Sequence, residues 1–282
     1  MNYRHAYHAG NHADVLKHIV LTRTLVHLQR KPKPVRVIDA HAGIGLYDLH
    51  GIEAGKTGEW EGGIGKMGPP FAPEIEDLLA PYRAVIAALN PHGGFVRYPG
   101  SPELVLRLLR AGDRLVANEL HPDDHARLAE RYDADPRVTV TKVDALACIR
   151  ASLPPAERRG LILIDPPYEA KDEARRAADM LRDGLRRFAT GVFLLWYPLK
   201  SDDTGPALLA MARDLGIPAT LQVELRVREA FAGGGLAGSG LIIVNTPWQL
   251  ETELTPVAAA LAGRLGLGSW GKSTVAWLVP PV

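Results

Sequence analysis

The stretch Gly160-Leu161-Ile162-Leu163-Ile164-Asp165-Pro166-Pro167-Tyr168 joins an apolar run to an acid, two prolines and a tyrosine. The apolar run has the length and composition of a strand buried on both faces of a sheet. A plain rigid turn accounts for Pro166 and Pro167, since prolines end a strand and fix the direction of the chain. It does not account for the carboxylate before them and the aromatic ring after them. Because ligands bind at the carboxyl ends of strands in open α/β sheets, the stretch predicts a binding site there.

On both sides of this stretch, apolar runs of strand length alternate with segments of helical periodicity. Strands are expected at residues 35–40, 114–120, 138–143, 192–197, 221–227, 240–244 and 274–279. Helices are expected at residues 14–30, 102–110, 122–132, 145–153, 171–187, 203–215 and 250–265. The alternation predicts an α/β fold with a mostly parallel, doubly wound, Rossmann-like sheet covered by helices on both faces.

One segment interrupts this alternation. Residues 48–94 hold a glycine-rich part and then an expected helix at 73–90, kinked at Pro81. A disordered linker is the alternative, but the apolar face of residues 75–89 argues against it. We therefore expect an N-terminal basic arm and helix at 1–34, followed by a Rossmann-like domain at 35–282 that an inserted helical subdomain, 48–94, interrupts.

The charge of the chain is unevenly distributed. Residues 1–36 hold seven Lys and Arg against Asp14 alone, a net charge of +6, whereas the whole chain carries +1. The remaining 246 residues therefore carry −5. A basic arm on a mildly acidic body is expected of a protein that grips a polyanion locally. A solvated helix face followed by an ordinary turn explains the same charges, so both readings stay open.

Composition excludes several classes of protein. Cys148 is the only cysteine, which rules out an internal disulfide and a cysteine-based zinc site. No apolar run approaches the roughly 18–20 residues of a membrane span, and no secretory signal is visible, so the cytoplasm is the expected location. His8 and His12 are spaced as a metal-binding pair, but no HExxH pattern accompanies them. We expect no metal and no membrane partner.

Acidic residues close three successive expected strands. Asp39 is followed by the loop His41-Ala42-Gly43-Ile44-Gly45, in which glycine allows close approach of a ligand. Glu119 stands where an acid usually accepts hydrogen bonds from ribose hydroxyls, and Asp144 stands where a carboxylate can receive an adenine amine. Each has an alternative as a helix N-cap or turn acid. The series as a whole favours a nucleoside-containing cofactor.

The turn at residues 165–168 suits chemistry on an exocyclic amine. The lone pair of an adenine amine is delocalised into the ring, so the amine is a poor nucleophile. The Asp165 carboxylate and the Pro166 carbonyl can each accept one N–H, which favours a pyramidal nitrogen with its lone pair directed at a methyl donor. The Tyr168 ring can stack on a base that has left its helix.

Several motifs together resemble the RlmJ family of bacterial 23S ribosomal RNA adenine-N6 methyltransferases. The similarity extends over nearly the whole chain and is carried by residues 3–18 (YRHAYHAGNHADVLKH), 39–43 (DAHAG), 98–102 (YPGSP), 119–122 (ELHP), 158–168 (RRGLILIDPPY) and 195–198 (LWYP). The resemblance implies a class I S-adenosylmethionine-dependent methyltransferase that modifies 23S ribosomal RNA. It also implies that residues 48–94 form the family's inserted helical subdomain.

The resemblance also implies roles for individual residues. Asp165 is the expected catalytic acceptor, assisted by Pro166 and Tyr168. Tyr3, Arg4 and His5 belong to an N-terminal motif expected to close over cofactor and substrate RNA, since residues 1–12 are too polar to cover a sheet. The expected S-adenosylmethionine pocket is lined by His18, His41, Ser101, Glu119, Asp144, the backbone at Ala145, and Asp165. A monomer without metal is expected.

Other functions explain part of the sequence. An adenine-N6 methyltransferase acting on DNA or another RNA would share residues 165–168, although DNA enzymes usually need a further domain to read sequence. A protein-glutamine methyltransferase typically has Asn in place of Asp165. An NAD-dependent oxidoreductase explains the sheet and the glycine loop, but Asp48 stands where its fingerprint requires Gly or Ala. A non-catalytic RNA-binding module explains the basic arm alone.

Overall fold

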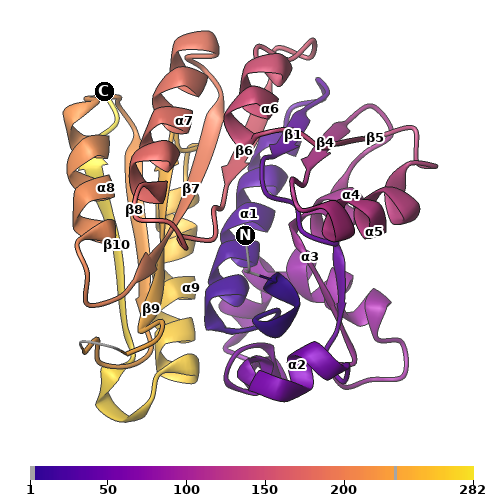
Figure 1. The fold of residues 1–282 in the computed structure, drawn as a ribbon. Helices are drawn as coiled ribbons and strands as arrows, with labels where there is room; N and C mark the ends of the chain where they lie inside the picture. Colours follow the sequence, from indigo (N-terminus) through magenta and orange to yellow (C-terminus); the bar gives the residue numbers. More distant parts are fainter. Residues whose placement is uncertain (1–3, 232–233) are drawn as a thin grey trace.

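The computed structural model describes residues 4–231 and 234–282 and contains one central eight-stranded sheet (Figure 1). The order across the sheet is β10 (Lys272–Val279), β8 (Thr220–Arg226), β9 (Gly238–Val244), β7 (Val192–Leu199), β6 (Gly160–Ile164), β1 (Arg36–Asp39), β4 (Arg114–Asn118) and β5 (Val138–Thr141). The five strands from β7 to β5 are parallel, whereas β9 runs antiparallel to both of its neighbours and β10 antiparallel to β8. The predicted mostly parallel Rossmann-like sheet is confirmed.

Helices cover both faces of this sheet, as the alternation of apolar runs predicts. One face carries α6 (Ala145–Ser152), α7 (Glu173–Arg187) and α8 (Thr204–Asp214). The other face carries α1 (His12–Gln29), α4 (Ser101–Leu108), α5 (Pro122–Tyr132) and α9 (Leu250–Leu265). The central strands β9, β7, β6, β1 and β4 are almost entirely buried, which explains their continuous apolar sequences, whereas the edge strands β5 and β10 are partly exposed.

Helix α1 differs from the amphipathic helix expected at residues 14–30. Asn11 caps it by accepting hydrogen bonds from the backbone N–H groups of Ala13 and Asp14. The helix is buried on nearly every side, because it packs against β9 and against α3 (Pro73–Leu89), α4 and α9. Its polar residues are therefore buried too and must find partners inside the protein. Periodicity alone does not show this, since only the apolar positions contribute to the pattern.

The insertion between β1 and β4 is helical, as predicted, but a short ribbon closes it. β2 (Leu46–Asp48) pairs antiparallel with β3 (Arg97–Pro99), and the chain between them forms α2 (Ile52–Thr57), two 3₁₀ turns and α3. Helix α3 runs through Pro81 as one element. Strands of three residues carry too few positions for alternation to be recognised, which is why β2 and β3 were not predicted.

Candidate active site

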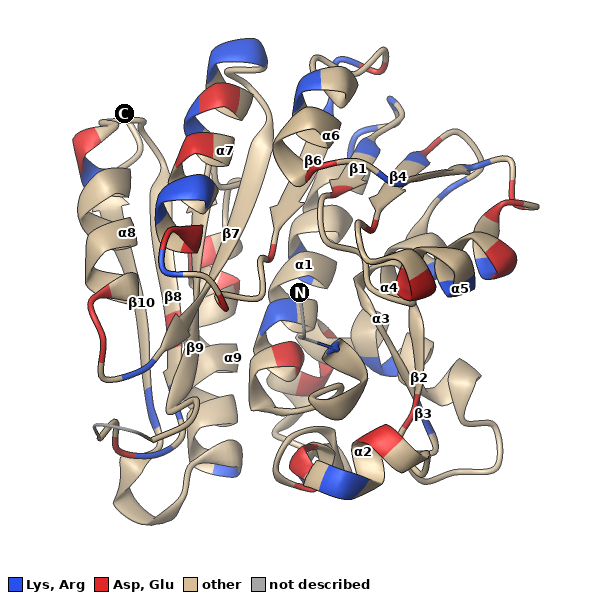
Figure 2. Cartoon of the chain, viewed as in Figure 1, with Lys and Arg blue, Asp and Glu red and all other residues tan. Residues whose placement is uncertain are grey.

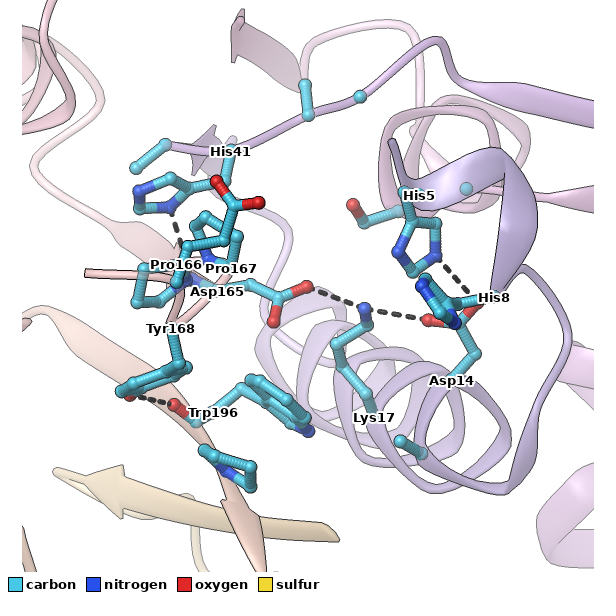
Figure 3. A pocket seen from close by; sticks show the side chains of 18 of the residues that line it. His5, His8, Asp14, Lys17, His41, Asp165, Pro166, Pro167, Tyr168 and Trp196 are labelled. Carbon is cyan, nitrogen blue, oxygen red and sulfur yellow. Dashed lines mark hydrogen bonds and ion pairs between the residues drawn. The ribbon is translucent and has the colours of Figure 1, made fainter. Parts of the chain in front are cut away.

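A cavity of about 520 Å³ opens at the carboxyl-terminal edge of the sheet. This volume lies within the range of pockets that hold small molecules. The loops after β1, β4 and β6 form one side of the cavity, and α1 with the N-terminal segment forms the other (Figure 3). Segments distant in sequence therefore meet at the edge where the sequence predicts a site.

The glycine loop after β1 is fixed by Glu119. Glu119 Oε2 accepts a hydrogen bond from the Gly43 N–H at 2.9 Å, and Oε1 accepts one from the His121 N–H at 2.8 Å. Gly43 has φ +61°, a conformation that favours glycine. Burial raises the pKa of Glu119, although these two backbone donors act against the shift. Glu119 thus shapes the loop and places a largely buried carboxylate at the cavity.

His41 connects the glycine loop to the turn after β6. Its Nδ1 accepts a hydrogen bond from the Asp165 backbone N–H at 3.2 Å. Burial lowers the pKa of His41 to about 4, so the ring is neutral near pH 7 and carries its proton on Nε2. The contact holds the backbone of Asp165 in place and leaves its carboxylate directed toward α1 (Figure 3).

The Asp165 carboxylate is paired with a buried lysine that the sequence analysis assigned only to the basic arm. Lys17 Nζ lies 2.6 Å from Asp165 Oδ2 and 2.8 Å from Asp14 Oδ1, with its side chain 5% exposed. Burial alone would lower the pKa of Lys17, but the two carboxylates outweigh burial and raise it. Burial alone would raise the pKa of Asp14, but His5 and Lys17 lower it well below its usual value. The lysine is therefore held charged beside the expected catalytic acid.

The chain of charges continues to the N-terminal segment. His5 Nε2 lies 2.8 Å from Asp14 Oδ2, which also accepts the Gly10 N–H at 2.9 Å. Asp14 is thus the shared partner of Lys17 and of the segment that precedes α1. The one signal for this arrangement in the sequence is the spacing of Asp14 and Lys17, three residues apart on one helix face.

Tyr168 is held in a strained conformation at the cavity wall. Its φ is +53°, a region that bulky residues rarely adopt. The hydroxyl donates a hydrogen bond to the Trp196 carbonyl at 2.7 Å, and the two rings lie 5.6 Å apart at 57°. Pro166 and Pro167 line the cavity beside it. The surroundings therefore fix an aromatic ring next to Asp165, with Trp196 as a second ring that the sequence analysis did not single out.

The remaining expected cofactor residues lie around the same cavity. Asp144 Oδ1 caps α6 by accepting hydrogen bonds from the backbone N–H groups of Leu146 and Ala147. Its other oxygen, Oδ2, lies 2.8 Å from Arg176 Nη2. The N-cap alternative for Asp144 is thus correct, and the residue also lines the cavity with Ala145. Ser101 lies at the start of α4 and is buried.

His18 faces the cavity from α1. It is buried, and its Nδ1 lies 3.0 Å from the Tyr98 hydroxyl. Burial lowers the pKa of His18 to about 3, so the ring is neutral. With His18, all seven residues expected to hold the cofactor, Asp165 among them, line one cavity, and so do Pro166 and Tyr168.

The N-terminal segment rests on the insertion. Glu59 contacts the segment through both of its carboxylate oxygens: Oε1 lies 3.0 Å from His8 Nδ1, and Oε2 accepts a hydrogen bond from Asn11 Nδ2 at 2.9 Å. The Thr57 hydroxyl donates a hydrogen bond to the Tyr7 carbonyl. Gly63 packs so closely that an added Cβ would lie 2.1 Å from the Gly10 carbonyl oxygen. Polar composition was therefore a poor guide to this segment, because residues 9–11 are buried against the insertion.

The three residues expected to contact RNA are placed differently. Arg4 Nη2 lies 2.8 Å from Asp124 Oδ1 on α5, and His5 lines the cavity beside Asp14. Tyr3 lies outside the described residues. Of the cations in residues 4–36, Arg4, Lys17, Arg23, Arg30 and Arg36 are each paired with a carboxylate. The arm is consequently much less free to grip a polyanion near the cavity than its composition indicates.

Within residues 4–231 and 234–282, no group of three or more His, Cys, Asp or Glu side chains is arranged to hold a metal ion. In the same part of the chain, no helix has the length and apolar content needed to cross a bilayer.

Comparison with known proteins identifies the family. The profile of the family described as ribosomal RNA large subunit methyltransferase D, RlmJ, matches residues 32–279. The chain belongs to this family. Two proteins named ribosomal RNA large subunit methyltransferase J, from Haemophilus influenzae and Escherichia coli, are each 40% identical to it over 99% of both sequences.

Solved structures share the fold of this chain. A crystal structure of a Legionella pneumophila protein is 32% identical, with a TM-score of 0.85 over 95% of this chain and 98% of that one. A probable spermidine synthase from Corynebacterium glutamicum, 12% identical over 92% of this chain and 74% of its own, has a TM-score of 0.50 and shares the fold alone. The RlmJ resemblance found in the sequence is confirmed, and S-adenosylmethionine is the cofactor of this family of methyltransferases.

Proposed function

We propose that this protein methylates the exocyclic N6 of one adenine in 23S ribosomal RNA. The observation that carries the proposal is the placement of Asp165 at the cavity, with Tyr168 beside it and Lys17 behind it. The two RlmJ relatives bear names for ribosomal RNA large subunit methylation, which supports the substrate class. The protein acts as a monomer in the cytoplasm, where ribosomal RNA is made.

The cavity suits S-adenosylmethionine in size and in chemistry. Glu119 offers a carboxylate for ribose hydroxyls, and Asp144 with the backbone at Ala145 lies where the adenine of the cofactor can bind. His18, His41, Ser101 and Asp165 complete the lining. When bound, the cofactor supplies an electrophilic methyl group.

The residues of the chain prepare the amine for transfer. Lys17 occupies Asp165 Oδ2 and leaves Oδ1 for one N–H of the target amine, while the Pro166 carbonyl accepts the other. These two acceptors favour a pyramidal nitrogen whose lone pair points at the methyl donor. Positioned polar groups of this kind are worth about 10²–10³ in turnover. Tyr168 stacks on the base, which must leave its helix to enter the cavity.

The N-terminal segment and the insertion form the closing wall in this proposal. Arg4 and His5 close over the bound base, as part of an N-terminal unit of residues 1–34. The same role is proposed for Tyr3, which is outside the described residues. The insertion, residues 48–94, supports that unit through Glu59. Residues 35–282 otherwise form the methyltransferase domain.

The experiment tests cofactor and substrate in turn. Calorimetric titration should show binding of S-adenosylmethionine and none of NAD. The purified protein is then incubated with S-adenosylmethionine and with 23S ribosomal RNA transcript, 16S transcript or duplex DNA, and nucleosides are analysed by mass spectrometry. We expect N6-methyladenine in the 23S transcript alone. Equal methylation of DNA or of 16S RNA would contradict the proposed substrate, and binding of NAD alone would contradict the reaction class.

A further inference from the structure

A cluster of basic residues lies at the amino-terminal edge of the sheet, opposite the cavity. It consists of residues 29–36, 110–114 and 157–159, and we call it the amino-edge patch. The register of the sheet brings the three segments together, since Arg36 pairs with Arg114 of β4 on one side and with Gly160 of β6 on the other. In Figure 2, blue segments lie at the starts of β1 and β4.

The charge of this patch differs from that of the rest of the protein. The three segments hold eight Lys and Arg against two carboxylates, a net charge of +6, in a chain whose total is +1. Of the two carboxylates, Asp113 is fully buried and Glu157 is occupied by Arg36 at 2.9 Å. Glu253 of α9 lies outside the three segments and pairs with Arg30 at 3.1 Å, which lowers the net charge around the patch to +5. Lys31 and Lys33 thus belong to an edge that keeps an excess of positive charge.

Two arginines hold the lysine-rich loop in a fixed shape. Arg110 Nη1 donates to the carbonyls of Gln29 and Lys31, each at 2.9 Å, and Nη2 donates to the Lys33 carbonyl at 3.0 Å. Arg159 also donates to the Lys33 carbonyl. Burial lowers the pKa of Arg159, and the nearby guanidinium of Arg110 adds to the effect. Asp113 offsets part of the repulsion between these like charges through its ion pair with Arg110, and a bound polyanion would offset more of it.

The side chains at the surface of the patch are suited to phosphate groups. Residues 30–34 are all exposed, and Lys31 and Lys33 alternate with Pro32 and Pro34 in a loop that holds no aromatic residue. Without an aromatic ring, the loop cannot stack on bases. Flexible ammonium groups bind phosphates without reading sequence.

We propose that the amino-edge patch binds the sugar-phosphate backbone of the substrate RNA at a distance from the target adenine. This inference rests on the proposed function, because it takes RNA as the substrate. Helix α1 has 18 residues and spans about 27 Å, with Asp14 and Lys17 near one end and the patch beyond the other. An RNA that touches both places must extend by about that length. The patch therefore contributes to RNA affinity and not to the chemical step.

The test compares two charge-matched double variants. Lys31→Gln/Lys33→Gln removes two charges from the patch. Arg213→Gln/Lys272→Gln removes two exposed charges from α8 and β10, at the far end of the sheet. Neither pair lines the cavity, so both proteins should fold and bind S-adenosylmethionine as wild type does. Kinetics are measured on two RNAs that contain the target adenine, the 23S transcript and a hairpin of about five base pairs. At about 3.4 Å per base pair, the hairpin is shorter than α1 and cannot reach the patch from the cavity.

We expect the patch variant to raise KM for the 23S transcript roughly threefold to tenfold with kcat unchanged. Its salt dependence should become shallower by roughly 1–2 in the log–log slope, the value for about two lost phosphate contacts. The control variant should behave as wild type, and all three proteins should be equal on the short hairpin. If both double variants change KM alike, or neither does, the patch proposal is wrong. Absence of methylation by the wild-type protein on any RNA would instead contradict the proposed function.

Discussion

Two lysine environments at opposite ends of α1 show how position decides what a charge does. Lys17 lies beside the cavity, 5% exposed and between two carboxylates. Lys31 and Lys33 follow the other end of the helix and are exposed in a loop held by two arginines. A buried charge with fixed partners controls geometry and protonation nearby. An exposed charge with few counter-charges controls association, so variants at the two ends should change different kinetic constants.

Replacement of Lys17 gives the largest expected effect. Lys17→Met leaves two carboxylates near one another without their shared cation, and removal of one partner from a buried ion pair costs about 3–5 kcal/mol of stability. Turnover should also fall, because Asp165 loses the group that orients it. Urea unfolding and single-turnover methylation measure the two losses.

A second variant separates stability from chemistry. Lys17→Met/Asp14→Asn removes one of the two carboxylates and should recover part of the lost stability while turnover stays low. If the double variant recovers turnover as well, Lys17 acts only on folding, and the contrast between the two ends of α1 loses its basis.

Asp165→Ala should lower turnover by about 10²–10³ while S-adenosylmethionine binds within about tenfold of its wild-type affinity. The reason is that the carboxylate accepts the target amine, whereas its backbone remains held by His41. Calorimetry and nucleoside mass spectrometry provide the two readouts. Substantial formation of N6-methyladenine by this variant would remove Asp165 from the catalytic role.

Glu119→Ala should weaken S-adenosylmethionine binding by about 1–3 kcal/mol, because ribose hydroxyls lose a charged acceptor inside a pocket. The glycine loop also loses its bond from the Gly43 N–H, so a control is needed. Glu119→Gln keeps an acceptor for that N–H and should lose less affinity. An unchanged dissociation constant in folded Glu119→Ala would exclude the residue from the cofactor site.

Buried histidines near the cavity should make the protein less stable in acid. Burial lowers the pKa of His12 and His41 to about 4 and that of His18 to about 3, below the unfolded value of 6.5. Between these values the unfolded chain binds more protons, so stability is lost as pH falls from 6.5 toward 4. Asp39, whose pKa burial raises to about 6, acts in the opposite direction. Burial also raises the pKa of Glu119 and that of Glu173, and Glu59 raises the pKa of His8, so these three groups oppose part of the loss as well.

A single substitution measures one part of this pH effect. At pH 5.5, His18 should account for about 1–2 kcal/mol of the loss relative to pH 7.5. His18→Gln keeps a partner for the Tyr98 hydroxyl and should reduce the loss by that amount in urea unfolding. A pH dependence identical to wild type would show that His18 is protonated in the folded protein.

The site at the sheet edge could be predicted because an acidic residue directly follows the apolar run of each strand concerned. Asp165, Glu119 and Asp144 each follow an apolar run, and parallel strands bring their carboxyl ends to one edge. The family motifs added His18 and Ser101, which no local pattern marks. The structure places all of these residues at one cavity, and their roles there stay predictions.

The N-terminal segment could not be predicted in the same way. Net charge does not show which cations are paired, and Lys17 and Arg23 are paired with acids 148 and 230 residues away. Such contacts depend on how α1 packs against α9 and the turn after β6. The sequence of residues 1–36 alone carries no information about these distant contacts. A segment whose cations are paired and a free basic arm can therefore have the same composition.

The most direct test of the function is a map of modified nucleosides in 23S ribosomal RNA from cells that lack this protein. The RNA is digested into defined fragments and analysed by mass spectrometry, before and after the cells receive the wild-type gene or the Asp165→Ala variant. The account predicts that one N6-methyladenine is missing, that the wild-type gene restores it, and that the variant does not. An unchanged modification map in the deletion cells, or full restoration by Asp165→Ala, would contradict it.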